Sequence, residues 1–176
     1  MSPQVMGVDL SLNNTGIAHA DGSVEVFTPR YNNSTNAGMD RLCEIRDHIA
    51  KATFAALDLV VIEGLAFDAH DTYRWGAQLA GIVRAALYDL GVPFILCPPG
   101  TLKKYATNNG KAGKDQVTNA AQKRLGYDGY QNDEADALWL RAIGLALCDA
   151  PAVEMPKVHD DALRLLRQQR PIQRPS

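Results

Sequence analysis

The first thirty residues constrain the fold most, because they hold three short apolar runs joined by tight turns. These runs cover residues 5–10, 15–20 and 23–28. Asp21-Gly22 joins the second run to the third, and two apolar runs separated by Asp-Gly are a strong signal for a β-hairpin. A short turn rich in asparagine joins the first run to the second. The segment therefore predicts three consecutive antiparallel strands.

Beyond residue 30, apolar residues recur at helical spacing in some segments and form short continuous runs in others. Helical spacing predicts helices at about residues 38–55, 69–90, 100–105, 115–126 and 132–149. Short continuous apolar runs predict buried strands at residues 57–62 and 92–97. Strands joined by helical crossovers lie parallel to their neighbours. We therefore expect an α/β fold, with a mixed sheet and helices on both faces.

The chain has 176 residues, which is enough for one domain with a substantial core. We place that domain at residues 1–150. Residues 151–176 form a proline-rich tail with a possible short helix, and its last segment, RPIQRPS, is expected to lack regular structure.

The lengths of the apolar runs and the spacing of the cysteines indicate the cellular compartment in which the protein works. There is no run of eighteen apolar residues, so we expect no transmembrane helix, and the first residues do not resemble a signal peptide. The three cysteines are widely spaced and form no CxxC pair, which disfavours both a disulfide framework and a zinc site. We therefore expect a cytoplasmic protein in a reducing environment.

Carboxylates stand at the ends of two predicted strands and at the start of the last strong helix. Asp9 ends the first strand and Glu63 ends the fourth, so both emerge at one sheet edge if these strands are parallel. Asp133 and Asp136 are three residues apart and share a helix face. Asp133 could instead be a helix cap, and Glu134 is the other candidate to complete the set.

Several carboxylates gathered at one point repel each other unless cations neutralise them. Oxygen ligands favour Mg²⁺ or Mn²⁺ over zinc. Two such ions, about 3.5–4 Å apart, can clamp the attacking and leaving oxygens of a phosphodiester. We therefore predict a site for two ions, built from Asp9, Glu63, Asp133 and Asp136, for phosphoryl chemistry.

The net charge of −2 does not indicate a nucleic-acid binder, but acids at a metal site mask basic residues in that total. Six basic residues fall within one stretch of 22 residues, namely Lys103, Lys104, Lys111, Lys114, Lys123 and Arg124. Such residues contact phosphates. We assign nucleic-acid binding to the first four, whereas Lys123 and Arg124 suit a solvated helix face equally well.

Four segments, in order, resemble the motifs of RuvC-type Holliday junction resolvases. They are GVDLSLNNTG from residue 7, VVIE from residue 60, the basic segment that includes GKAGKDQV from residue 110, and DEADAL from residue 133. The resemblance covers roughly residues 5–148. It implies an RNase H-like fold with a five-stranded mixed sheet, and a homodimeric, metal-dependent endonuclease that nicks two strands of a four-way DNA junction.

The resemblance also implies roles for single residues. It makes the four carboxylates the catalytic metal ligands and places Lys103 and Lys114 near the scissile phosphate. Phe67 is the plausible counterpart of an aromatic residue that engages junction bases in some members. Leu10 departs from the family, which usually has proline at that position, and the segment after Glu63 differs as well.

Three other functions remain open. One is a nuclease of the same fold that acts on flaps, forks or RNA. Another is a nucleotide-binding domain of the actin/sugar-kinase type, whose first motif also reads G-x-D-x-x-x-x-x-G, although that class normally needs a second such domain. The last is a junction-binding protein without catalysis, against which the intact acids argue.

Overall fold

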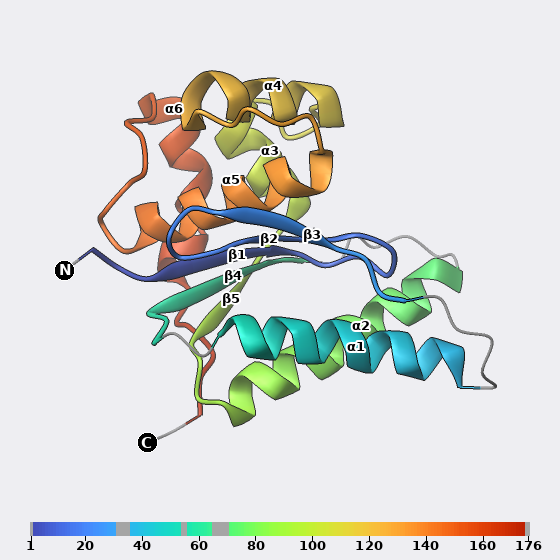
Figure 1. Cartoon of the computed structure of the whole chain (residues 1–176). Coiled ribbons are helices and arrows are strands. Elements are labelled where there is room, and N and C mark those ends of the chain that lie inside the picture. Colours follow the sequence, from blue (N-terminus) through green and yellow to red (C-terminus); the bar gives the residue numbers. More distant parts are fainter. Residues whose placement is uncertain (1, 31–35, 54–55, 65–70, 175–176) are drawn as a thin grey trace.

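Five strands form one sheet in the order β3-β2-β1-β4-β5 (Figure 1). The computed structural model describes residues 2–30, 36–53, 56–64 and 71–174. The strands are β1 (Val5–Asp9), β2 (Thr15–Ala18), β3 (Val24–Phe27), β4 (Leu59–Glu63) and β5 (Phe94–Cys97). The first three are antiparallel to one another, whereas β4 is parallel to β1 and to β5. The predicted mixed five-stranded sheet is confirmed.

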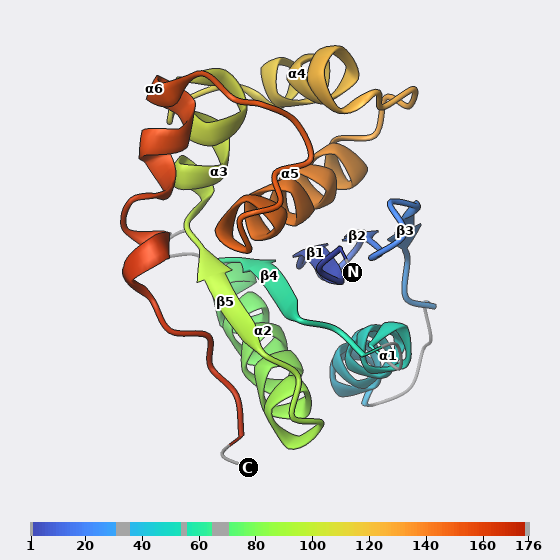
Figure 2. The same ribbon diagram turned by 90° about the vertical axis from the view of Figure 1, so that its left-hand side faces the viewer.

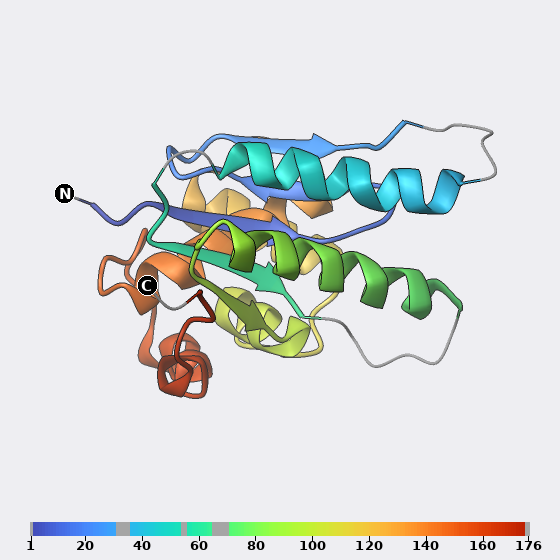
Figure 3. The same ribbon diagram turned by 90° about the horizontal axis from the view of Figure 1, so that it is seen from below.

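Helices cover both faces of this sheet (Figure 2). They are α1 (Ala37–Ala52), α2 (Asp71–Asp89), α3 (Pro99–Thr107), α4 (Lys114–Leu125), α5 (Asn132–Leu147) and α6 (Lys157–Asp160). Helices α1 and α2 lie side by side across one face (Figure 3), and α5 crosses the other face beneath α3 and α4. The helices expected from apolar spacing are present, with ends that differ by a few residues.

The two faces of the central strands enter two separate cores. On β1 and β4, Val8 and Ile62 pack with α1 and α2, whereas Val5 and Val61 pack with α5. This alternation follows from the two-residue period of a strand. Asp9 and Glu63 are an even number of residues from Val5 and Val61, so both point toward the α5 face.

Two glycines allow α5 to approach the sheet closely. A Cβ atom built on Gly7 would lie 2.2 Å from the carbonyl oxygen of Ala137, and one built on Gly16 would lie 2.0 Å from that of Asp133. Both neighbours are backbone atoms of α5 and cannot rotate away. The start of α5 therefore lies where it does because β1 and β2 carry no side chain at these positions.

The tail has more structure than its sequence indicates. After α6 it forms two short 3₁₀ helices, and Leu163 and Leu166 are buried in the core that includes α5. Ile172 then exchanges two backbone hydrogen bonds with Phe94 of β5, at 3.0 and 2.8 Å. The tail descends from α6 beside β5 (Figure 2). The expectation that RPIQRPS lacks regular structure is wrong at this bridge.

Trp75 of α2 lies partly at the surface and is 41% exposed. It lies over Gly38, where an added Cβ would come within 2.5 Å of the indole ring. No helix in the described part of the chain combines the length and apolar content that crossing a membrane requires.

Candidate active site

Asp9 and Glu63 are neighbours on parallel strands. The last paired residues of β1 and β4 are Val8 and Ile62, and the two acids follow one residue later. Adjacent strands lie about 4.8 Å apart. The parallel pairing of two apolar strands, each ending in an acid, therefore brings the two carboxyl groups together, and Asp9 is only 7% exposed.

Asp133 and Asp136 enter from α5. The N-cap of this helix is Gln131, which makes no side-chain capping bond, and Asp133 lies in the first turn. The alternative that Asp133 caps the helix is therefore wrong. A spacing of three residues places Asp136 on the same face one turn later, and the close packing of α5 at Gly16 directs this face to the end of β1.

One pocket of about 330 Å³ gathers all four acids. Lys103 of α3 and Lys114 of α4 line the same pocket. Four further residues complete its wall beside the acids and lysines, and these are Leu10, Ser11, Gly64 and Pro99. The pocket thus joins strand ends, one helix face and two cations from separate parts of the chain.

The carboxyl groups of Asp9 and Glu63 lie close enough to affect each other's ionisation. Burial raises the pKa of Asp9 well above its usual range, and the negative charges of Glu63 and Asp133 raise it further. Burial likewise raises the pKa of Glu63, and the negative charge of Asp136 adds to this effect. Burial and nearby negative charge thus favour the protonated forms of both acids.

Burial also raises the pKa of Asp136 to about 7, with a further contribution from the charge of Asp9. Lys114 and Lys103 act in the opposite direction but do not cancel the effect. Desolvated, mutually repelling carboxylates of this kind are common at functional sites. The negative charge that the acidic side chains would carry is therefore not balanced by the lysines of the pocket.

Glu134 belongs to a different group of contacts. Its carboxylate accepts a hydrogen bond from the Tyr127 hydroxyl, and it does not line the acidic pocket. Of the two candidates for the fourth acid, Asp133 is the one that lies at the pocket. The choice could not be made from sequence, because the partner, Tyr127, lies seven residues earlier in a connecting loop.

The basic residues assigned to nucleic-acid binding divide into two sets. Lys103 and Lys114 line the pocket, whereas Lys104 and Lys111 are exposed outside it. Phe67 lies outside the described residues. A role in nucleic-acid binding remains a prediction for all five.

The donor set suits a hard divalent cation, because it consists of carboxylate oxygens whose mutual repulsion such an ion relieves. Among the residues described, however, no group of three or more His, Cys, Asp or Glu side chains is arranged to hold one ion as it stands. The raised pKa values favour the uncharged forms of Asp9 and Glu63. Ion binding would require these two carboxyl groups to be ionised.

Comparison with known proteins identifies similar chains. No protein-family model matches the sequence. Crossover junction endodeoxyribonuclease RuvC of Anaeromyxobacter sp. (strain K) is 39% identical over 69 residues, which are 39% of this chain and 37% of the relative. RuvC of Anaeromyxobacter dehalogenans (strain 2CP-1) matches equally well. The match thus spans little more than a third of the length of these curated relatives.

Solved structures extend the similarity to the whole fold. Thermus thermophilus RuvC in complex with a Holliday junction substrate has a TM-score of 0.65 and 16% sequence identity, covering 97% of this chain and 99% of that one. A second T. thermophilus RuvC structure has a TM-score of 0.59 and 17% identity, covering 96% and 99%. The predicted RNase H-like fold is confirmed, and sequence and structure together support the resemblance to RuvC-type resolvases.

Proposed function

We propose that this chain is a metal-dependent endonuclease that resolves four-way DNA junctions by paired, symmetric nicks. The observation that carries the proposal is the pocket in which Asp9, Glu63, Asp133 and Asp136 face Lys103 and Lys114. The similarity to RuvC supports the choice of a branched DNA substrate, since one similar structure is a RuvC complex with a Holliday junction.

The four carboxylates would hold Mg²⁺ or Mn²⁺, two ions in each site. When bound, such ions supply Lewis acidity and a nucleophilic water for phosphodiester hydrolysis. Asp9 is the one buried acid of the four, which supports a direct role for its carboxylate in holding the ions. Glu63 would complete the set from β4, and Asp133 and Asp136 from α5.

Lys103 and Lys114 would hold the DNA backbone at the pocket. They approach it from α3 and α4, whereas the acids come from the sheet and α5. A phosphate placed between the two groups would meet lysine on one side and the carboxylate-bound cations on the other. The lysines also favour the ionised forms of Glu63 and Asp136, because their charge lowers both pKa values.

Paired nicks require two sites related by symmetry, and we propose a homodimer. A two-fold dimer places identical sites on a two-fold junction. Helix α2 is the proposed interface element, and the exposed side chains of Trp75 and Tyr88, with Leu90 directly after the helix, support this assignment. Measurement of the solution mass tests it, and a monomer at the concentration used for cleavage would contradict it.

The test of function is cleavage of synthetic four-way, flap and linear DNAs, each with and without Mg²⁺. We expect symmetric nicks confined to the four-way junction and only with the metal. Asp136→Asn should abolish cutting but keep junction binding, because it removes a pocket carboxylate and adds no bulk. Glu134→Gln on the same helix is the matched control and should cut at the wild-type rate.

Each alternative predicts its own result. Preferential cutting of flaps would identify a nuclease of the same fold with another substrate. Turnover of ATP without DNA cutting would identify the nucleotide-binding class. Undiminished cutting by Asp136→Asn would show that the acidic pocket is not the site of hydrolysis.

A further inference from the structure

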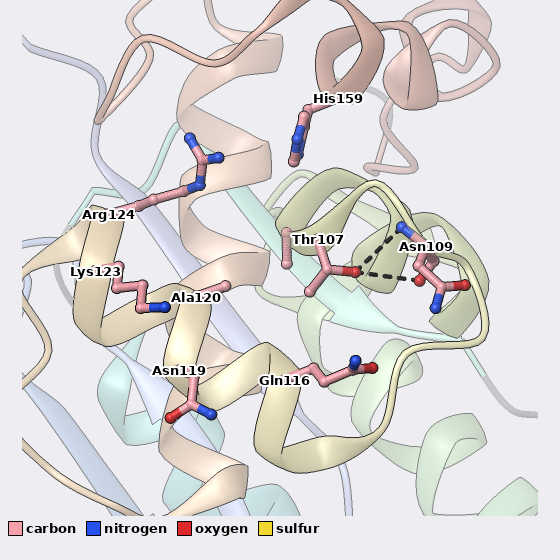
Figure 4. A pocket seen from close by; sticks show the side chains of 9 residues that line it. Thr107, Asn109, Gln116, Asn119, Ala120, Lys123, Arg124 and His159 are labelled. Atoms are coloured by element: carbon pink, nitrogen blue, oxygen red, sulfur yellow. Dashed lines mark hydrogen bonds between the residues drawn. The ribbon is translucent and has the colours of Figure 1, made fainter.

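A second pocket, of about 380 Å³, lies between α3, α4 and α6 (Figure 4). Nine residues line it and none of them is acidic. Its charged members are Lys123 and Arg124, and most of the others carry amide, hydroxyl or imidazole groups. In a chain whose net charge is −2, this local composition favours an anionic ligand.

One face of α4 supplies more than half of the pocket lining. Its residues follow a helical stripe at positions i, i+3, i+4, i+7 and i+8: Gln116, Asn119, Ala120, Lys123 and Arg124. Apart from Ala120 this stripe is polar and basic, and its four polar members are exposed, so their side chains can reach a ligand from solution.

The polar groups of the pocket are held in place by neighbouring backbone. The Gln116 side-chain oxygen accepts a hydrogen bond from the Gly113 N–H at 3.0 Å, which leaves its NH₂ group free to donate to a ligand. On the facing wall, the Thr107 hydroxyl contacts the backbone N–H and carbonyl of Asn109, both at 3.2 Å (Figure 4).

The tail closes the far side of the pocket. His159 of α6 is only 7% exposed, and its Nδ1 lies 2.7 Å from the carbonyl oxygen of Tyr105 in α3. A carbonyl only accepts, so Nδ1 donates and fixes the ring against α3. Figure 4 shows His159 opposite the side chains of α4.

The pocket lies on the same two helices as the lysines of the acidic pocket. Lys114 and Lys123 are nine residues apart on α4, a rise of about 14 Å along the helix. Nine residues also make about two and a half turns of helix, so the two lysines lie on opposite sides of α4. Successive phosphates of one DNA strand rise by only about 3.4 Å each along the duplex axis, so the two pockets would meet different phosphates.

We propose that this pocket binds a backbone phosphate of the DNA other than the phosphodiester that is cut. Lys123 and Arg124 supply the charge, Gln116 donates a hydrogen bond, and His159 fixes the wall. The inference rests on the proposed nuclease function and extends it to a second phosphate on one junction arm. The tail, through α6, then takes part in forming a DNA-binding surface.

The first test is the salt dependence of binding to a synthetic four-way junction, measured in EDTA so that no cutting occurs. Lys123→Gln/Arg124→Gln should make the slope of log K against log salt shallower by about 0.9, because the pocket no longer neutralises its one phosphate. The control double variant, Lys51→Gln/Arg170→Gln, removes two exposed charges elsewhere and should leave the slope unchanged.

The second test replaces single phosphates with neutral methylphosphonates along the cleaved strand. Wild type should lose affinity when one phosphate away from the cut is neutralised, and the Lys123/Arg124 double variant should be indifferent to the same replacement. An unchanged salt slope in this variant, with normal junction binding by wild type, would overturn the second phosphate site alone. Weaker binding of inorganic phosphate with an unchanged junction slope would also overturn it, in favour of a free-anion site. A wild-type protein that does not bind junctions would overturn both proposals.

Discussion

Replacing Gly16 by alanine should impair cleavage far more than it impairs folding. Gly16 on β2 pairs directly with Asp9 on β1. On its α5 side, an added Cβ would lie 2.0 Å from the carbonyl oxygen of Asp133. The substitution therefore places a methyl group between the strand that carries one acid and the helix turn that carries another.

The expected losses of folding free energy and of cleavage rate follow from that distance. Ordinary van der Waals contact for a Cβ begins at about 3.4 Å, so the first turn of α5 must move by more than 1 Å. Overpacking of this kind typically costs about 1–3 kcal/mol of folding free energy. A misplacement of about 1 Å at a catalytic site can cost on the order of 100-fold in rate. We expect both effects in Gly16→Ala.

The assay compares thermal unfolding with single-turnover cleavage of a four-way junction at saturating Mg²⁺, well below the unfolding temperature. At about 2–4 °C for each kcal/mol, the melting temperature should fall by roughly 2–12 °C. Gly81→Ala in α2 is the control for the effect on folding, because its added Cβ meets nothing within 4 Å in its own chain. It should leave stability equal or slightly higher. Wild-type cleavage by Gly16→Ala would refute the link between this close packing and the site.

Three further outcomes are expected. Without divalent metal, the free energy of unfolding should fall as pH rises from about 4 through 7. The pKa values of Asp9, Glu63 and Asp136 are raised in the native protein, so it binds more protons in this range than the unfolded chain does. Urea titrations in EDTA at several pH values measure this dependence, and Asp136→Asn should flatten it. At about pH 8, Mg²⁺ should raise the melting temperature of wild type and leave that of Asp136→Asn nearly unchanged, since a ligand that binds only the native state stabilises it. Deletion of residues 171–176 removes the backbone pair between Ile172 and Phe94, so the melting temperature should fall by a few degrees while junction cleavage persists.

Much of the fold could be predicted because its signals are local. Three apolar runs with an Asp-Gly turn indicated the antiparallel strands, and the change of apolar period indicated each helix. The tail could not be predicted in the same way. Its bridge to β5 depends on Phe94, almost eighty residues earlier, and the burial of Leu163 and Leu166 depends on α5. A short polar segment carries no local sign of such partners.

The acidic pocket was predictable for a similar reason. An acid that directly follows a buried strand must emerge at the sheet edge, so Asp9 and Glu63 could be placed once the strands were taken as parallel. How strongly burial raises the pKa of Asp9 could not be foreseen, nor could the contact between Tyr127 and Glu134. Each depends on side-chain positions that only the packed helix and loop determine.

The net charge of the whole chain was a poor guide to nucleic-acid binding, whereas the positions of the charged residues were a good one. A net charge of −2 argues against nucleic-acid binding only if the charges are mixed evenly over the surface. In the folded chain, four acids lie in one pocket, where bound cations would cancel them, while basic side chains gather on α3 and α4. With the pocket acids neutralised, the surface that DNA would meet is basic. The affinity of this chain for DNA should therefore depend on divalent metal even before any bond is cut, and binding measured with Ca²⁺ in place of EDTA would show whether it does.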